Sequence, residues 1–275
     1  HGARLVMNLE LAQSEAYAVV VWWFTTGIIL YLDGLPRRTF RWSMIACTGM
    51  MLAAVNGLHN SAADASAAGA YAAFTCAILV WGWLEMSFLM GFVTGPRKHA
   101  CSDGCGGWRH FVHAAQAIIY NEIATLVGGA VVLAATWQSA NHTGLWTYAI
   151  LWSMRLSAKL NLFLGVPNVG EKFLPIHLQY LKGFFKTRRM NFLFPLSVSA
   201  ATIVAVLLWQ HCLAAVDAYQ VTAYALMSSL LALAVLEHWF MVLPLPSEKL
   251  WGWGLRSGRL QPLEPRIAVK APSEC

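Results

Sequence analysis

The sequence alternates between long apolar runs and short polar links. Runs of roughly 16 to 25 residues, about the length that crosses the hydrocarbon core of a bilayer as a helix, occur seven times. The charged residues gather between the runs, which is unlike the amphipathic pattern of a soluble domain. We therefore predict an all-α, polytopic integral membrane protein with seven transmembrane helices. The predicted spans are residues 17–32, 43–58, 70–93, 111–134, 145–165, 192–210 and 219–243.

Composition and charge support this prediction and give it an orientation. Hydrophobic residues make up 58% of the chain and charged residues 12%, whereas soluble domains are about one quarter charged. Sixteen of the nineteen Lys and Arg residues lie in the links after the first, third and fifth runs or in the tail. By the positive-inside rule these segments face the cytoplasm, so the N-terminus lies outside and the C-terminus is cytoplasmic. The net charge of +6 then reflects orientation and lipid headgroups, and we expect no nucleic-acid partner.

We predict three segments along the chain: an outer N-terminal extension (1–16), the seven-helix transmembrane domain (17–243) and a cytoplasmic C-terminal tail (244–275). In the fifth link, from about residue 172 to 189, Leu178, Leu181 and Phe185 recur at helical spacing. This spacing predicts an amphipathic helix on the cytoplasmic surface, and residues 250–259 (LWGWGLRSGR) are expected to form another.

Five ionisable side chains interrupt the apolar runs and form the candidate site. Charge within a membrane costs roughly 2.5 to 3.5 kcal/mol per residue on insertion scales, so it marks function unless it is paired. Counted at ~1.5 Å per residue from the cytoplasmic end of each run, the five lie between about 9 and 16 Å deep, on four helices. A mutual polar cluster is the economical inference. Its members are Glu85, Glu122, Arg155, Lys159 and Glu237.

The cluster has more than one reading. In a structural lock, Arg155 would form a two-point contact with Glu122. Lys159, one turn further along the same face, would then reach Glu85 or Glu237. The same carboxylates could instead form a proton or ion path, although a proline interrupts only one span interior. A retinal protein is excluded, because the last predicted span holds no lysine for a Schiff base.

Metal and pigment ligation are further readings of the polar residues. A carboxylate-rich di-iron set, without the usual Glu-x-x-His pairs, would use Glu85, Glu122, Glu237 and His238. A neutral imidazole in an apolar helix can also ligate the central metal of a tetrapyrrole, which makes His238 and His113 candidate pigment ligands. The Gly-rich loop HACSDGCGGWRH fits an ordinary turn and also offers four zinc-type ligands: His99, Cys101, Cys105 and His110.

Five stretches of the chain are long and unusual in sequence. They are VWWFTTGIILYLDGLPRRTFRWSM (21–44), GAYAAFTCAILVWGWLEMSFLMGFVTGPR (69–97), LWSMRLSAKLNLFLGVPN (151–168), NFLFPLSVSA (191–200) and LEHWFMVLPLP (236–246). Together they resemble the PuhE family of photosynthetic complex assembly proteins, over about residues 17 to 257. The resemblance implies a multi-pass protein of the intracytoplasmic photosynthetic membrane, a bacterial inner membrane, with its N-terminus in the periplasm.

The resemblance also implies a function. It points to an assembly factor or accessory subunit for the photosynthetic reaction centre and the core light-harvesting complex, with their subunits as partners and with a link to bacteriochlorophyll supply. The alternative is a membrane-bound, metal-dependent enzyme of bacteriochlorophyll metabolism, with iron as the candidate metal. The family supplies no active site, so Asn161 enters the polar cluster only as a motif position. Asn121 departs from the family pattern, which has His before the Glu, and this weakens a metal-ligand role at Glu122.

Overall fold

The computed structural model describes residues 2–101 and 106–255, and these residues are helical apart from their links. Within them no strand forms, and one isolated bridge joins Val166 to Thr187. This confirms the predicted all-α class for the described residues. The elements are α1 (Gly2–Asp33), α2 (Arg37–Ser61), α3 (Ala67–Leu89), α4 (Gly107–Ala135), α5 (Thr143–Leu164), η1 (Glu171–Phe173), η2 (Ile176–Phe184), α6 (Leu193–Ala214), α7 (Ala218–Phe240), η3 (Ser247–Trp251) and α8 (Gly252–Leu255).

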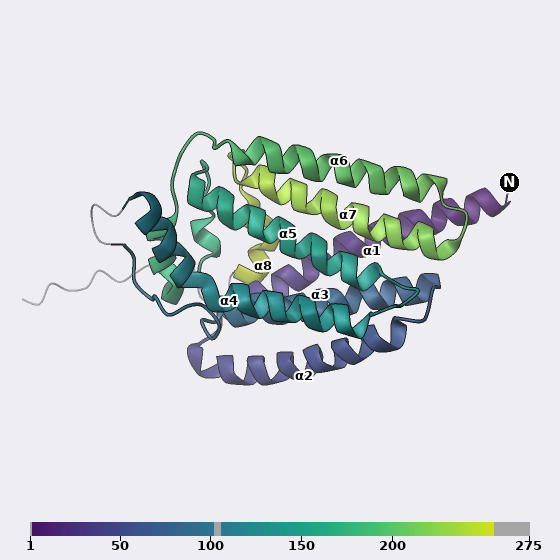
Figure 1. Ribbon diagram of the computed structural model, residues 1–275, viewed down its shortest axis with the longest axis horizontal. Helices are drawn as coiled ribbons and strands as arrows, with labels where there is room; N and C mark the ends of the chain where they lie inside the picture. The colour runs from purple at the N-terminus through teal and green to yellow at the C-terminus, as the bar shows by residue number, and fades with distance from the viewer. Residues whose placement is uncertain (1, 102–105, 256–275) are drawn as a thin grey trace, which may run out of the picture.

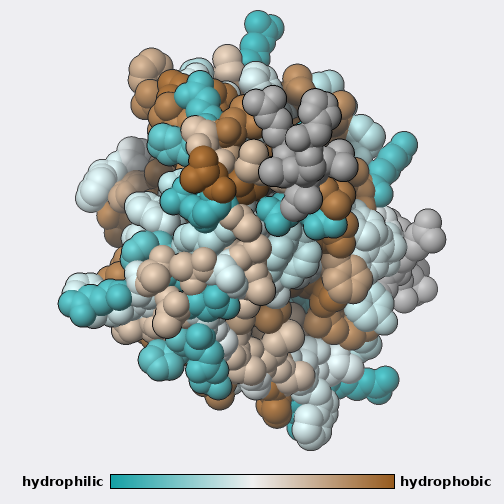
Figure 2. Space-filling view, turned by 90° about the vertical axis from the view of Figure 1, so that its right-hand side faces the viewer, coloured by the Kyte–Doolittle hydropathy of each residue, from teal (hydrophilic) through white to brown (hydrophobic). Residues whose placement is uncertain are grey.

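The long helices run in alternate directions, so their links gather at two ends of the bundle (Figure 1). One end holds the N-terminus and the links after α2, α4 and α6, which contain no Lys or Arg. Figure 2 views this end, where polar side chains lie among hydrophobic ones. The links after α1, α3 and α5 lie at the opposite end together with the described cations of those links, and we call this end the basic end.

Five helices of the described chain are long and apolar enough to cross a membrane: α1 from Met7, α3, α4, α6 and α7. Two further helices, α2 and α5, coincide with predicted spans but contain more polar residues. Three arginines lie in the first turns of α2, and α5 carries Arg155 and Lys159. A multi-pass membrane protein is therefore supported, while the count of seven spans and their orientation stay predictions.

α3 and α7 form the centre of the bundle. Half of the most apolar stretch of α3 and 56% of that of α7 are buried, compared with 17% for α1 and α6. Phe74 and Ile78 of α3 pack against Leu226 and Leu230 of α7 in one buried cluster. The outer helices consequently present long apolar faces to their surroundings.

The link after α3 packs lengthwise against α4. α3 was expected to continue to residue 93, but it ends at Leu89 because Gly91 adopts the left-handed conformation, with φ +82°, which favours glycine at a helix end. Beyond this turn the Asn121 N–H donates to the Thr94 carbonyl, 3.1 Å away. Gly95 lies so close to α4 that a Cβ atom there would be 2.7 Å from the carbonyl carbon of Ala117.

The segment after α5 forms a 3₁₀-helix where an amphipathic α-helix was expected. In η2 the buried side chains are Leu178, Leu181 and Phe184, and the expected Phe185 is only partly buried. A 3₁₀-helix has three residues per turn, so positions three apart share one face. That face packs against Phe88 of α3, which attaches η2 to the basic end of the bundle.

The chain after α7 folds back along α1. Trp251 is buried against Trp22, and its Nε1 donates to the Trp23 carbonyl at 3.0 Å. In return, Trp23 Nε1 donates to the Leu250 carbonyl at 2.8 Å. The first part of the predicted tail is thus packed onto the first helix, and the tail beyond residue 255 lies outside the described residues.

The close approach of the α3–α4 link to α4 predicts that Gly95→Ala destabilises the protein. The added methyl group would meet helix backbone, which cannot rotate away, so we expect a loss of about 1–3 kcal/mol, the usual cost of overpacking. Thermal unfolding in detergent, followed by circular dichroism, measures it. Gly49→Ala in α2 is the control, because a Cβ there meets nothing within 4 Å. Equal unfolding temperatures for the two variants would contradict the close approach.

Candidate functional site

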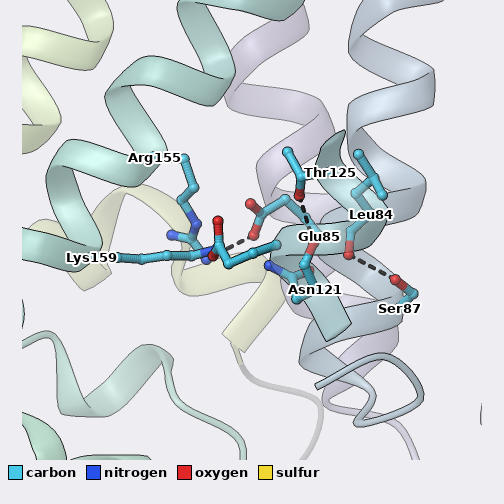
Figure 3. Close-up of polar contacts among 8 residues, drawn as sticks. Leu84, Glu85, Ser87, Asn121, Thr125, Arg155 and Lys159 are labelled. Atoms are coloured by element: carbon cyan, nitrogen blue, oxygen red, sulfur yellow. Dashed lines mark hydrogen bonds and ion pairs between the residues drawn. The ribbon is translucent and has the colours of Figure 1, made fainter. Parts of the chain in front are cut away.

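Arg155 and Lys159 lie one turn apart on α5 and point toward α3 and α4 (Figure 3). Arg155 Nη2 is 2.8 Å from Oε2 of Glu85 on α3. Lys159 Nζ is 2.7 Å from Oε1 of Glu122 on α4. We call these four residues the ion-pair cluster. Because the two cations share one helix face, a single helix makes charged contacts with two neighbours.

The pairing is the reverse of the expected one. Sequence counting paired Arg155 with Glu122 by a two-point contact, and this prediction is wrong. Arg155 makes one contact, through Nη2 to Glu85, and its Nε has no hydrogen-bond partner among the described residues. Lys159 pairs with Glu122, which the sequence argument had assigned to Arg155.

The offset of α4 explains the exchange. The Asn121 N–H bonds to Thr94, which lies beyond the basic-end terminus of α3. Glu122 is therefore nearer the basic end than a count from the start of its apolar run suggests. Lys159 is likewise one turn nearer that end than Arg155, so it lies level with Glu122.

The two ion pairs differ in enclosure. The Lys159 and Glu122 side chains are 17% and 22% exposed, whereas Arg155 is 37% exposed. Lys159 Nζ also lies 5.6 Å from the ring centroid of Phe88, close enough for a cation–π contact. The Lys159–Glu122 pair is thus enclosed on both sides and adjoins an aromatic ring, whereas in the other pair Arg155 is the open member and Glu85 is 17% exposed.

Neutral hydrogen bonds tie α5 to α4 beside the cluster. Tyr148 Oη, from a side chain 2% exposed, donates to the Thr125 carbonyl at 2.6 Å. Thr125 Oγ1 in turn donates to the Asn121 carbonyl one turn earlier (Figure 3). Tyr148 was not among the predicted site residues. The Gly128–Gly129 pair of α4 is the sequence feature that indicates a close neighbour here, because a Cβ at Gly128 would lie 2.7 Å from the tyrosine oxygen.

Glu237 lies within electrostatic range of Arg155 and Glu85 but forms no direct contact with the ion-pair cluster. It is exposed on α7, and its Oε1 accepts a 2.8 Å hydrogen bond from Trp22 Nε1 of α1. Among the described residues no Lys or Arg forms an ion pair with it. Neither Glu85 nor Glu237, the two alternatives expected for Lys159, is its ion-pair partner, because Lys159 is engaged by Glu122 of α4.

A buried neutral network joins α5 to α7. His238 is 2% exposed, and its Nδ1 lies 2.9 Å from the Ala234 carbonyl, so this nitrogen carries the hydrogen. The other nitrogen, Nε2, accepts from Ser157 Oγ at 2.9 Å. Asn161, fully buried, donates to the Ser157 carbonyl at 3.0 Å. Asn191 of the link before α6 donates to the Asn161 carbonyl at 3.2 Å.

The four residues of the expected di-iron set have protein partners in this structure. Glu85 and Glu122 each hold a cation that would repel a metal ion, and the remaining two residues bind Trp22 and Ser157. Across the described ranges, no three His, Cys, Asp or Glu side chains converge as ligands.

The candidate pigment and zinc ligands are also engaged by protein groups. His238 is 2% exposed, and its Nε2 is engaged by Ser157 Oγ in this structure. His113 Nδ1 of α4 lies 3.1 Å from Cys101 Sγ, so the link after α3 places Cys101 beside this histidine. His110 stacks on Phe163 instead, with ring centroids 5.4 Å apart. His99 lies beside its neighbour's carbonyl, and Cys105 lies outside the described residues.

Comparison with known proteins places these features in a family. A family model described as "Protein of unknown function (DUF3623)" matches residues 8–261. The chain is also 39% identical, over 243 residues, to a Rhodobacter capsulatus protein named "Uncharacterized 30.4 kDa protein in puhA 5'region". That alignment covers 87% of this chain and 89% of the relative. No solved structure matches the chain significantly.

The enclosed ion pair predicts an unequal effect of single and double substitutions. Lys159→Met would leave the Glu122 carboxylate without its cation and should cost about 2–3 kcal/mol. Adding Glu122→Gln removes the unpaired charge and should restore most of that loss, to within about 1 kcal/mol of the parent protein. Thermal unfolding of the single and double variants in detergent measures the coupling.

The Arg155–Glu85 pair supplies the comparison for this cycle. The cycle of Arg155→Met with Glu85→Gln measures the coupling energy of the second pair in the same way. A larger coupling between Lys159 and Glu85 than between Lys159 and Glu122 would contradict the observed pairing.

Proposed function

The chain belongs to the family described as "Protein of unknown function (DUF3623)", and on that premise we propose that it acts as an assembly factor or accessory subunit in a photosynthetic membrane. The partners in this proposal are subunits of the reaction centre and the core light-harvesting complex, or their assembly intermediates. The observation that carries the proposal is the name of the Rhodobacter capsulatus relative, which places that protein in the 5' region of puhA. This agrees with the resemblance of five long stretches to the PuhE family.

The proposal includes seven transmembrane helices with the N-terminus in the periplasm and the C-terminus in the cytoplasm. Each predicted apolar run has its own helix, including the more polar α2 and α5. The described cations of the links gather at one end of the bundle, which supports a single cytoplasmic face. A bacterial inner membrane is the location that follows.

Association between helices is the mechanism that the geometry supports best. α4 and α6 border the bundle, and only 22% and 17% of their most apolar stretches are buried. Exposed side chains such as Leu126 and Val127 of α4, and Ile203 and Leu207 of α6, form the outer surface. In a bilayer such faces can exchange lipid for helices of a partner. The ion-pair cluster would hold α4 in place while it presents this face.

Isolation from photosynthetic membranes tests the proposal. A tagged copy should retain reaction-centre or antenna chains in mild detergent, detected by mass spectrometry, and the eluate should show bacteriochlorophyll absorption from those chains. A transient factor would be enriched with incomplete complexes, and a stable subunit would appear in mature complexes at a fixed ratio. An eluate that contains the tagged protein in normal yield but neither pigment nor photosynthetic chains would contradict the proposal.

Replacing the enclosed Lys159–Glu122 pair by neutral residues distinguishes a structural role of the pair, the lock, from a role in a proton path. The double variant Glu122→Gln/Lys159→Met keeps the shape of the contact but no titratable group, so a lock predicts that complex levels stay within about twofold of those with the parent protein. Near-infrared absorption of whole membranes measures them. Normal accumulation of the variant protein together with loss of the complexes would instead favour a role in which the charges themselves act.

A further inference from the structure

A cavity of about 720 Å³ opens at the basic end, between the start of α2, the link after α3 and η2. Four cations line it: Arg37, Arg38, Arg41 and Lys98. They come from the start of α2 and from the link after α3, about 60 residues apart in the sequence, so the fold itself gathers them. The charge of this cavity is consequently a property of the tertiary structure.

Among the described residues none of these four cations forms an ion pair, although Arg41 lies over the Trp42 ring, 5.2 Å from its centroid. The ion pairs of the described residues involve other partners, and the first turn of α2 contains no acidic residue. Backbone N–H groups at a helix start add partial positive charge, which disfavours cations there. Three arginines at the beginning of α2 therefore repel one another and the helix end, and an anion in the cavity would relieve both effects.

The rest of the lining is apolar and hydroxylic. Phe40 and Met90 are 6% and 5% exposed and form a hydrophobic part of the wall, whereas Phe92, also in the lining, is 56% exposed. The buried Tyr180 hydroxyl lies beside the Thr94 side chain, so two hydroxyl groups belong to the lining. Cations, a hydroxyl donor and apolar walls together suit a ligand that combines an anionic group with a hydrophobic one.

We propose that this cavity binds the phosphate group of an anionic phospholipid, with the Arg37, Arg38, Arg41 and Lys98 side chains around the phosphate and the acyl chains leaving over Phe92. A free phosphate ion offers the same charge but occupies little of the volume and makes no contact with the aromatic wall. The lipid is the occupant that satisfies both parts of the lining. This binding does not depend on the proposed role in photosynthesis, because it rests on the cavity alone.

Titration of the purified, delipidated protein tests the site. The probes are short-chain phosphatidylglycerol, the matching phosphatidylcholine and inorganic phosphate, in neutral detergent at low ionic strength, followed by calorimetry. We expect saturable binding of phosphatidylglycerol at one site, with phosphatidylcholine at least about tenfold weaker. Inorganic phosphate that binds as tightly as phosphatidylglycerol would overturn the lipid assignment and indicate a soluble phosphate as the ligand.

Two adjacent arginine pairs provide matched variants. Arg37→Gln/Arg38→Gln removes two cations from the cavity and should weaken phosphatidylglycerol binding by about tenfold or more. Arg188→Gln/Arg189→Gln removes two exposed cations at the same end but outside the lining, and should change binding by less than about threefold. Equal weakening in both would indicate general electrostatic attraction and would overturn the site.

A double variant that preserves charge controls for the loss of folded protein. Arg37→Lys/Arg38→Lys keeps both positive charges and should retain binding within about fivefold at an unchanged unfolding temperature. Phosphatidylglycerol binding that survives in the Gln pair as strongly as in the Lys pair would contradict the proposal, because the two differ only in charge and shape at the cavity.

Discussion

A charged side chain in an apolar helix bundle needs a partner of opposite sign, and this requirement sets how α3, α4 and α5 lie together. The two cations of α5 can be neutralised only where a carboxylate of another helix is at the same level. One pair fixes α5 against α3 and the other fixes it against α4. Sliding any of the three helices by one turn, about 5.4 Å, would separate at least one pair, so the contacts define register as well as proximity.

α5 uses its two sides for different kinds of polar contact. Arg155 and Lys159 occupy one side, while Ser157 and Asn161 face the network that includes His238. Positions two apart on an α-helix are turned by about 200°, so the alternating sequence places charged groups and neutral groups on opposite sides. The charged side meets α3 and α4, and the neutral side meets α7. This arrangement gives each of the four side chains a partner, so the more polar helix can lie inside the bundle.

The helices were largely predictable, because each apolar run is long and each link is polar. The position of individual residues along the bundle axis was less predictable. Counting from the ends of apolar runs misjudged Glu122, since the link through Thr94 runs beside α4 and displaces it along the bundle. The period of η2 was also missed. Phe184 and Phe185 are both apolar, so the sequence does not show whether the next buried position lies three or four residues after Leu181. Such offsets arise from packing between segments, which a single sequence does not display.

The contacts of Tyr148 and Glu237 were only partly indicated by the sequence. The two glycines of α4 indicated a close neighbour but not that Tyr148 would fill the space. Glu237 had the right residue type and depth for the cluster, but its side chain meets Trp22 of α1. Residue type and depth therefore restrict the possible partners, and the rotation of each helix about its axis selects among them.

The return of the chain after α7 has a consequence for the order of folding during synthesis. Trp22 and Trp23 leave the ribosome early, but Trp251 follows after more than two hundred further residues. The contacts of Trp22 and Trp23 with the chain after α7 can form only after Trp251 has been synthesised. Until then that side of the first helix stays open, which gives nascent chains a surface that the finished protein no longer offers.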